Sequence, residues 1–108
     1  MLDNIKLLLG IASDNEDRDE LLELIIRNTT ARLKVLCGGA DPGKDLDYIV
    51  QDVSIIRYNR IGSEGMTSHT VDGESNVFVD SDFDSYAGDI AAWLEKQESG
   101  SRGKLRFL

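Results

Sequence analysis

The feature that most constrains the fold is a long apolar stripe in the segment that follows Asp17 and ends near Cys37. Its apolar positions recur at intervals of three and four, as on one face of an α-helix. These positions are Leu22, Ile25, Ile26, Thr29, Leu33 and Leu36. Acids and possible N-cap residues in 13–17 favour a helix start, and Gly38-Gly39 favours a glycine C-cap. The sequence therefore predicts a long amphipathic helix that needs partners to cover its face.

Three further helices are predicted around it by the same periodicity. A short first helix ends between residues 10 and 13, and its apolar positions are Leu2, Ile5, Leu8, Leu9 and Ala12. A third helix runs from near Asp45 to near Gly62, after a turn at 41–43, with a core face of Leu46, Ile49, Val50, Val53 and Ile56. A fourth, capped by Ser81 or Asp82, ends near Glu98, with a stripe of Tyr86, Ile90, Trp93, Leu94 and Gln97.

Two segments lack helical periodicity. Residues 63–80 are rich in Gly, Ser and Thr, and Asp72-Gly73 is a hairpin turn signal, so we expect a long loop or a short β-hairpin. Residues 99–103 are typical of a flexible linker, and 104–108 alternate basic and apolar residues as a strand does. The expected fold is all-α: a four-helix domain over 1–98, with that loop or hairpin between the third and fourth helices, and an extended C-terminal tail over 99–108.

Size and charge limit the function classes. With 108 residues the chain is expected to form one domain, and no apolar run or N-terminal signal pattern indicates a membrane or secreted protein, so an intracellular product is expected. The net charge is -8, and since 99–108 carry +3, residues 1–98 carry -11. Phosphate binding requires a basic face, so general nucleic-acid binding is disfavoured. The single Cys37 is expected to be a buried structural thiol.

No motif supports catalysis, a metal or a cofactor. Residues 38–45 match P-loop spacing, but Asp45 replaces the magnesium-binding hydroxyl and the segment follows a helix. The acids at 80, 82 and 84 begin like a calcium loop, but Ala91 stands where the bidentate glutamate belongs, so capping explains them better. His69 has no partner residues of a zinc or nucleophile site nearby.

A small regulatory protein that binds DNA through a helix-turn-helix is the main alternative, formed by the second and third helices. A recognition helix presents its N-terminal part to the bases. Here that part carries Asp45, Asp47 and Asp52, whereas the arginines lie at the other end. The charge placement therefore opposes DNA readout.

The string from Arg57 to Phe78 is unusual. Its pattern is R-Y-N-R-x-G-x-E-G, followed by serines and by D-G-x-S leading to an aromatic residue. It resembles the phage head-tail connector proteins, also called adaptor or head-completion proteins, of long-tailed phages and prophages of Gram-positive bacteria. The order and length of the other segments agree, including the basic ending, so the resemblance covers nearly the whole chain.

The resemblance implies a structural, all-helical subunit of the virion, present in the host cytoplasm during assembly. It implies a homo-oligomeric ring of about twelve copies on the portal protein, which extends the DNA channel and offers a platform to a stopper, second connector or tail protein. Phage DNA would pass through without sequence-specific binding, and an acidic lumen would not hold its phosphates. No catalytic residue, cofactor or membrane contact is implied.

We expect subunit or partner contacts from the unusual string and from the tail. The candidates in the string are Arg57, Tyr58, Asn59, Arg60, Gly62, Glu64, Gly65, Ser68, Gly73, Ser75 and Phe78. The candidates in the tail are Arg102, Lys104, Arg106 and Phe107, which would dock on the portal by strand addition. An internal ion pair of Arg57 or Arg60 with Glu64 remains equally compatible with the sequence.

Overall fold

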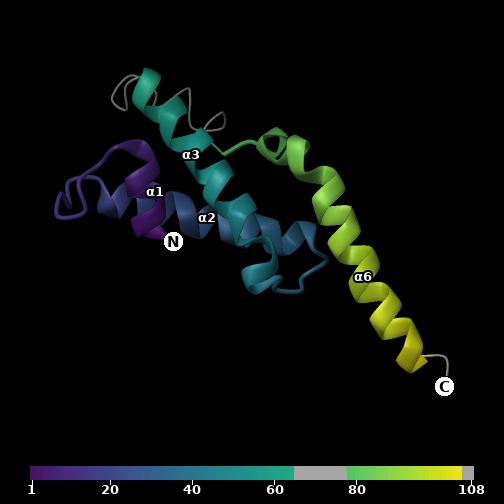
Figure 1. The fold of residues 1–108 in the computed structure, drawn as a ribbon. Coiled ribbons are helices and arrows are strands. Elements are labelled where there is room, and N and C mark those ends of the chain that lie inside the picture. Colours follow the sequence, from purple (N-terminus) through teal and green to yellow (C-terminus); the bar gives the residue numbers. More distant parts are fainter. Residues whose placement is uncertain (65–77, 106–108) are drawn as a thin grey trace.

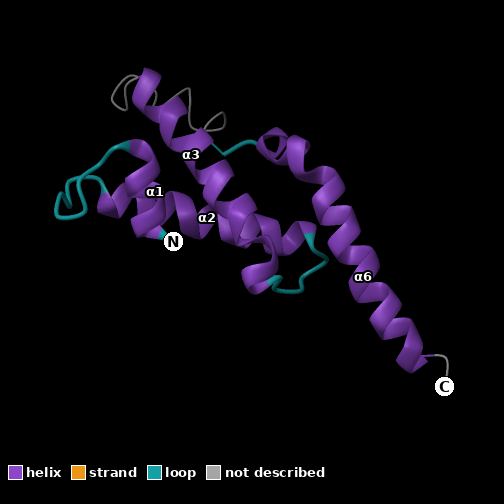
Figure 2. Cartoon of the chain, viewed as in Figure 1, coloured by secondary structure: helices purple, strands orange, loops and turns teal. Residues whose placement is uncertain are grey.

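The computed structural model describes residues 1–64 and 78–105, and the regular structure in these ranges is entirely helical (Figures 1 and 2). The helices are α1 (Leu2–Leu9), α2 (Asp19–Leu36), α3 (Asp47–Glu64) and α6 (Ala87–Leu105), with 3-10 turns η1 (Gly43–Leu46) and η2 (Asp80–Tyr86) before α3 and α6. The predicted all-α class and the four helices are confirmed. No helix in the described ranges is long and apolar enough to cross a membrane.

The core lies where α2 and α3 cross and where η2 and the first half of α6 cover them (Figure 1). Its buried members are Leu33, Cys37, Leu46, Ile49, Val50, Val53, Phe83 and Ile90. Cys37 is buried as expected, and burial, followed by the nearby Asp41, raises the pKa of its thiol. The thiol is therefore a packing group and is kept protonated.

Glycines end the first two helices as predicted. Gly10 has a left-handed φ of 77°, and Ile11 N–H returns to the Lys6 carbonyl at 2.8 Å. Gly38 and Gly39 have φ of 74° and 92°, and Gly39 N–H bonds to the Lys34 carbonyl at 2.9 Å. The turn that follows is also confirmed, because an Asp41 carboxylate oxygen accepts from Gly43 N–H at 2.9 Å.

The start of α2 differs from the prediction. The helix begins at Asp19, and no side chain caps its first turn, so the cap expected within 13–17 is absent. Lys6 of α1 fixes this region instead. Its ammonium group is buried, donates to the Ser13 carbonyl at 3.1 Å and pairs with the Asp19 carboxylate at 2.8 Å. One buried charge thus ties α1, the connecting turn and the first residue of α2 together.

The core face of α3 also differs from the prediction at its C-terminal end. Ile56 was expected in the core but is 42% exposed, whereas Arg57 is 1% exposed and Ser54 is buried. The face continues from Val53 by steps of one and four, to Ser54 and Arg57, rather than by a step of three. The apolar pattern predicted the wrong face because the inward-pointing position of this turn is occupied by the charged side chain of Arg57.

Helix α6 is fastened to η1 and α3 by its N-terminal half. Trp93 donates to the Asp45 carboxylate at 3.0 Å, and the Tyr86 hydroxyl, just before α6, donates to Asp52 at 2.8 Å. Burial, and then the bond to Asp52, raises the pKa of Tyr86 to about 12. The predicted stripe is confirmed for Ile90, Trp93 and Leu94, which are buried or half-buried, but Gln97 is exposed.

Beyond Leu94 the helix leaves the body and continues through Leu105 (Figure 1). The expected helix end near Glu98, the flexible linker over 99–103 and the strand from 104 are therefore wrong as far as Leu105. Gly and Ser weaken a helix by about 1 kcal/mol or less each, and without a proline an existing helix can propagate through them. The projecting helix gives the chain a radius of gyration of 16.5 Å and a longest dimension of 56 Å.

The loop or hairpin predicted over 63–80 falls mostly on residues 65–77, which lie outside the described residues. At its flanks the boundaries differ from the prediction, because α3 continues to Glu64 and η2 begins at Asp80.

A matched pair of substitutions tests the corrected face of α3. Ile49→Ala should lower the free energy of unfolding by about 2–5 kcal/mol, because Ile49 is fully buried. Ile56→Ala should lower it by less than about 1 kcal/mol, because that side chain is largely in water. Urea unfolding followed by circular dichroism measures both, and equal losses would contradict the assigned face.

Candidate functional site

The described part of the predicted contact string is centred on the buried guanidinium group of Arg57. Its Nε donates to the Asp82 carboxylate at 3.0 Å, and Nη2 donates to the Val79 carbonyl at 3.2 Å. Nη1 donates to the side-chain oxygens of Asn28 and Thr29 at 3.1 and 3.2 Å. One side chain of α3 thus binds α2 on one side and the segment entering η2 on the other.

Aromatic rings complete the surroundings of this guanidinium. Its central carbon lies 5.3 Å from the centre of the Phe78 ring and 5.4 Å from that of Phe83. Rings at this distance stabilise a cation through their negative faces, and more so away from water. The Arg57 side chain therefore has partners for its charge, for its donors and for its flat faces.

Asp82 carries the opposite charge and also binds Arg60. The Arg60 guanidinium donates to both carboxylate oxygens, one of them at 3.1 Å, and only 5% of the Asp82 side chain is exposed. Burial acts to raise the pKa of Asp82, but the hydrogen bonds and charges of Arg60 and Arg57 outweigh it and hold that pKa below its usual value. We call Arg57, Arg60 and Asp82 the arginine clamp.

The clamp joins the two flanks of residues 65–77. Arg57 and Arg60 lie on α3, close before Glu64 where it ends, and they bind Val79 and Asp82 at the start of the next element. The clamp therefore sets the position of η2, and through it of α6, on α3. The sequence left open an internal pair with Glu64; among the described residues, both arginines form ion pairs with Asp82.

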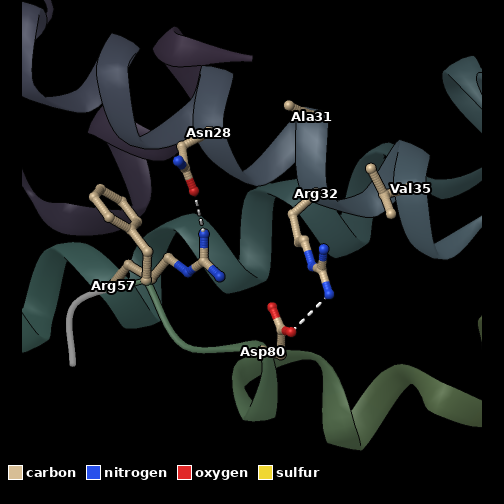
Figure 3. A pocket seen from close by; sticks show the side chains of 7 residues that line it. Asn28, Ala31, Arg32, Val35, Arg57 and Asp80 are labelled. Atoms are coloured by element: carbon tan, nitrogen blue, oxygen red, sulfur yellow. Dashed lines mark hydrogen bonds and ion pairs between the residues drawn. The ribbon is translucent and has the colours of Figure 1, made fainter. Parts of the chain in front are cut away.

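A groove of about 420 Å³ opens beside the clamp, between α2 and residues 78–80. Figure 3 shows its lining: Asn28, Ala31, Arg32 and Val35 from α2 lie above Arg57 and Asp80. Arg32 pairs with Asp80 at 2.7 Å, and both side chains are substantially exposed. Exposed pairs of this kind contribute at most about 1 kcal/mol, so this pair can exchange partners readily.

The other predicted contact residues are dispersed. Tyr58 is half-buried and Asn59 exposed on α3, Gly62 and Glu64 lie in its last turns, and Phe78 packs on Arg57. Arg102 and Lys104 belong to the projecting end of α6. Six of the predicted positions lie outside the described residues, namely Gly65, Ser68, Gly73 and Ser75 in the string and Arg106 and Phe107 in the tail. The structure brings together Arg57, Arg60 and Phe78 alone among these predicted residues, within the described ranges.

Sequence reasoning missed the three residues whose side chains bind Arg57, which are Asn28, Thr29 and Asp82. Asp82 was interpreted as a helix cap, because an acid before an apolar stripe is the usual capping signal. The residues that it binds lie 22 and 25 positions earlier. No local pattern could identify such a pair, although two arginines at a spacing of three on one helix are a signal for a shared carboxylate.

Comparison with protein-family models decides the family. Residues 1–93 match the model of the phage gp6-like head-tail connector protein. The chain belongs to this family. The match includes α1, α2, α3, the clamp and the first part of α6, and it ends at Trp93, one residue before the last core contact of that helix at Leu94. Comparisons with curated proteins and with solved structures give no match.

Membership makes the protein a structural component of phage particles, with a place at the head-tail interface and with portal and tail proteins as its partners. The geometry agrees with a structural role for the clamp, since its donors and acceptors are directed at one another. Within the described ranges no group of three or more His, Cys, Asp or Glu residues could hold a metal ion.

The depressed pKa of Asp82 predicts how the connector's stability depends on pH. A carboxyl group whose pKa is lower in the folded state contributes stability above its unfolded value of 3.8, and the contribution is lost as pH falls through the folded-state value. Asp82→Asn should lower the free energy of unfolding at pH 7 by about 3 kcal/mol, because it leaves two arginines without a counter-charge.

The difference in the free energy of unfolding between wild type and Asp82→Asn should then become steadily smaller below about pH 4. Urea unfolding between pH 7 and pH 2.5 measures it. Asp84→Asn, at an exposed position of the same turn, is the matched control and should track wild type throughout. A gap that stays constant across this range would show that the Asp82 charge does not stabilise the fold.

Proposed function

We propose that this connector assembles as a ring of about twelve copies on the portal of the filled capsid, extends the DNA channel, and provides the platform for a stopper, second connector or tail protein. The observation that carries the proposal is the family match over residues 1–93. The finer points, which are the ring, its copy number and its seat on the portal, are supported by physical features of the surface.

The first supporting feature is exposed apolar surface on several sides. Leu7 and Leu8 of α1 are 77% and 61% exposed, and Val35 at the end of α2 is 59% exposed. Single exposed leucines are common, but neighbouring pairs on a short helix favour a protein contact. A closed ring is made by heterologous contacts, so each copy must show two different surfaces to its neighbours. A chain with apolar side chains on both α1 and α2 meets that need.

The second supporting feature is charge. Residues 1–98 carry -11, so a ring of this body would surround the passing DNA with acidic surface. DNA phosphates are repelled by such a surface, and the genome can move through without being held. The alternative of DNA readout by α3 gains no support, because Asp45 and Asp52 near its start already bind Trp93 and Tyr86 of the same chain.

The third feature is the position of the predicted contact residues. Arg57 is buried, so we propose that it serves assembly as a positioning residue by holding η2 and α6 in place. We propose subunit or partner contacts for the exposed Asn59 and for the last turns of α3 with Gly62 and Glu64. The sequence of residues 65–77 adds further candidates for these contacts. The C-terminal segment 99–108 is proposed as a docking element for a protein partner.

Sedimentation of the connector with the portal protein of the same phage tests this function. The full chain should form a complex with several connector copies per portal, and a version ending at Glu98 should bind at least about tenfold more weakly because its docking element is gone. That version loses only the projecting end of α6 and keeps Trp93 and Leu94, so its melting temperature should remain close to wild type.

Two outcomes would count against the proposal. If the full chain forms no complex with the portal protein at physiological salt, assembly on the portal is ruled out. If it also shifts a DNA fragment under those conditions, a DNA-binding regulator becomes the better account.

A further inference from the structure

Helix α2 carries a second apolar stripe, on a face that does not pack against the core. Its positions are spaced alternately by three and four residues, as in the contact seam of a coiled coil. They are Leu21, Leu24, Asn28, Ala31 and Val35. The core stripe lies about a third of a turn away around the helix, and it is formed by Leu22, Ile25, Thr29 and Leu33. We call the second stripe the outer seam.

The outer seam is open to solvent along most of its length. Leu24 is 48% exposed and Val35 is 59% exposed, and Ala31 between them is also exposed. Two grooves follow the seam. One, of about 480 Å³, includes Leu21 and Leu24, and the groove beside the clamp includes Asn28, Ala31 and Val35 (Figure 3). Single exposed apolar side chains are common, but an exposed seam with this spacing is suited to a second helix.

Charged residues are divided unevenly along the same helix. Residues 14–23 contain six acids and one arginine, whereas residues 24–37 contain two arginines, one lysine and no acid. Four exposed charged residues flank the outer seam and form no ion pair among the described residues: Asp17 and Glu20 at its acidic end, and Arg27 and Lys34 toward its basic end. This placement also suits the dipole of a single helix, but the dipole does not explain an exposed apolar seam between the charges.

A second copy of α2 complements this pattern only in the antiparallel direction. If two copies ran parallel, acidic start would lie beside acidic start and basic end beside basic end. In the antiparallel direction the acidic start of each helix lies beside the basic end of the other, and the two seams face each other. Opposite charges then meet at both ends of the contact, which selects this arrangement over the parallel one.

We infer that two copies of the free protein form a two-fold dimer through the outer seam, with their α2 helices antiparallel. The seam spans about two heptads, or roughly 21 Å, so the contact is small and the association is weak and reversible. A two-fold contact uses the same surface on both copies, so it stops at two copies and cannot itself close a ring. The dimer is therefore a form of the free protein, distinct from the proposed ring.

The dimer covers Val35, whose exposed side chain the proposed ring also offers to a neighbouring copy. A copy would then leave the dimer before it takes its place in that ring. This consequence alone rests on the proposed ring, whereas the dimer itself does not.

Charge reversal at each end of the outer seam tests the antiparallel arrangement. The acidic-end variant carries Asp17→Lys and Glu20→Lys, and the basic-end variant carries Arg27→Glu and Lys34→Glu. When either variant pairs with itself, like charges meet at both ends of the contact. When one variant pairs with the other, opposite charges meet at both ends again.

Sedimentation equilibrium of the free, full-length proteins over a concentration series measures the association constant, at low salt where charge pairs are least screened. Each charge variant alone should dimerise at least about tenfold more weakly than wild type, and an equal mixture of the two should recover most of the association. Circular dichroism verifies that each variant is folded.

A matched pair of leucine substitutions tests the apolar part of the contact. Leu24→Asn should weaken dimerisation by at least about tenfold, because the partner's seam covers this side chain in the dimer. Leu7→Asn is the control. It removes a leucine that is 77% exposed on α1, outside the outer seam, and it should dimerise like wild type.

Three results would overturn the inference. If wild type stays monomeric over the whole series, or forms species larger than a dimer, the two-fold dimer is wrong; assembly on the portal is measured separately and is not affected. If Leu24→Asn dimerises like wild type, the outer seam is not the contact. If the charge variants associate as strongly as wild type, or their mixture associates no better than either alone, the helices are not antiparallel.

Discussion

The rest of the structure depends on one buried ion pair, that of Arg57 with Asp82. Burial of a guanidinium group is costly unless its charge and its donors find partners. Here they find α2 through Asn28 and Thr29, and the segment before α6 through Val79 and Asp82. Because these bonds have direction, they fix the position of the segment more tightly than apolar contacts can. The apolar core packs α2 against α3, and the clamp fixes the position of η2, and through it of α6, relative to these two helices.

The consequence is an elongated connector with different ends. At one end, the ion pair of Lys6 with Asp19 joins α1 to the acidic start of α2. Near the other end, hydrogen bonds of Trp93 and Tyr86 hold the N-terminal half of α6. A ring-forming subunit needs unlike surfaces at a fixed mutual orientation. In this chain the Lys6 ion pair and the hydrogen bonds of Trp93 and Tyr86 hold the two ends on the body formed by α2 and α3, as the proposed ring would require.

Much of the fold could be predicted from the sequence, because helix periodicity and glycine caps are local signals. The start of α2 and the end of α6 could not. At Asp19 the helix is fixed by Lys6, thirteen residues earlier, and at 99–105 the weak preferences of Gly and Ser were overridden by continuation of a helix already formed. Only part of the clamp could be predicted. The unusual string indicated Arg57 and Arg60, but Asp82 lies 25 residues after Arg57, and a pair at that separation produces no periodic pattern in the sequence. The burial of Ile56 was predicted wrongly for the same reason, because the buried position on that turn of α3 is occupied by Arg57.

The most direct test of the clamp is a double-mutant cycle between α3 and η2. The free energy of unfolding is measured by urea denaturation for wild type, Arg57→Met, Asp82→Ala and the double variant. If the pair fixes η2 on α3, each single change costs about 3–5 kcal/mol, and the double variant costs much less than their sum, with a coupling of about 2 kcal/mol or more. A coupling below about 0.5 kcal/mol would mean that the two side chains stabilise the fold independently, and the central role given to this ion pair would be wrong.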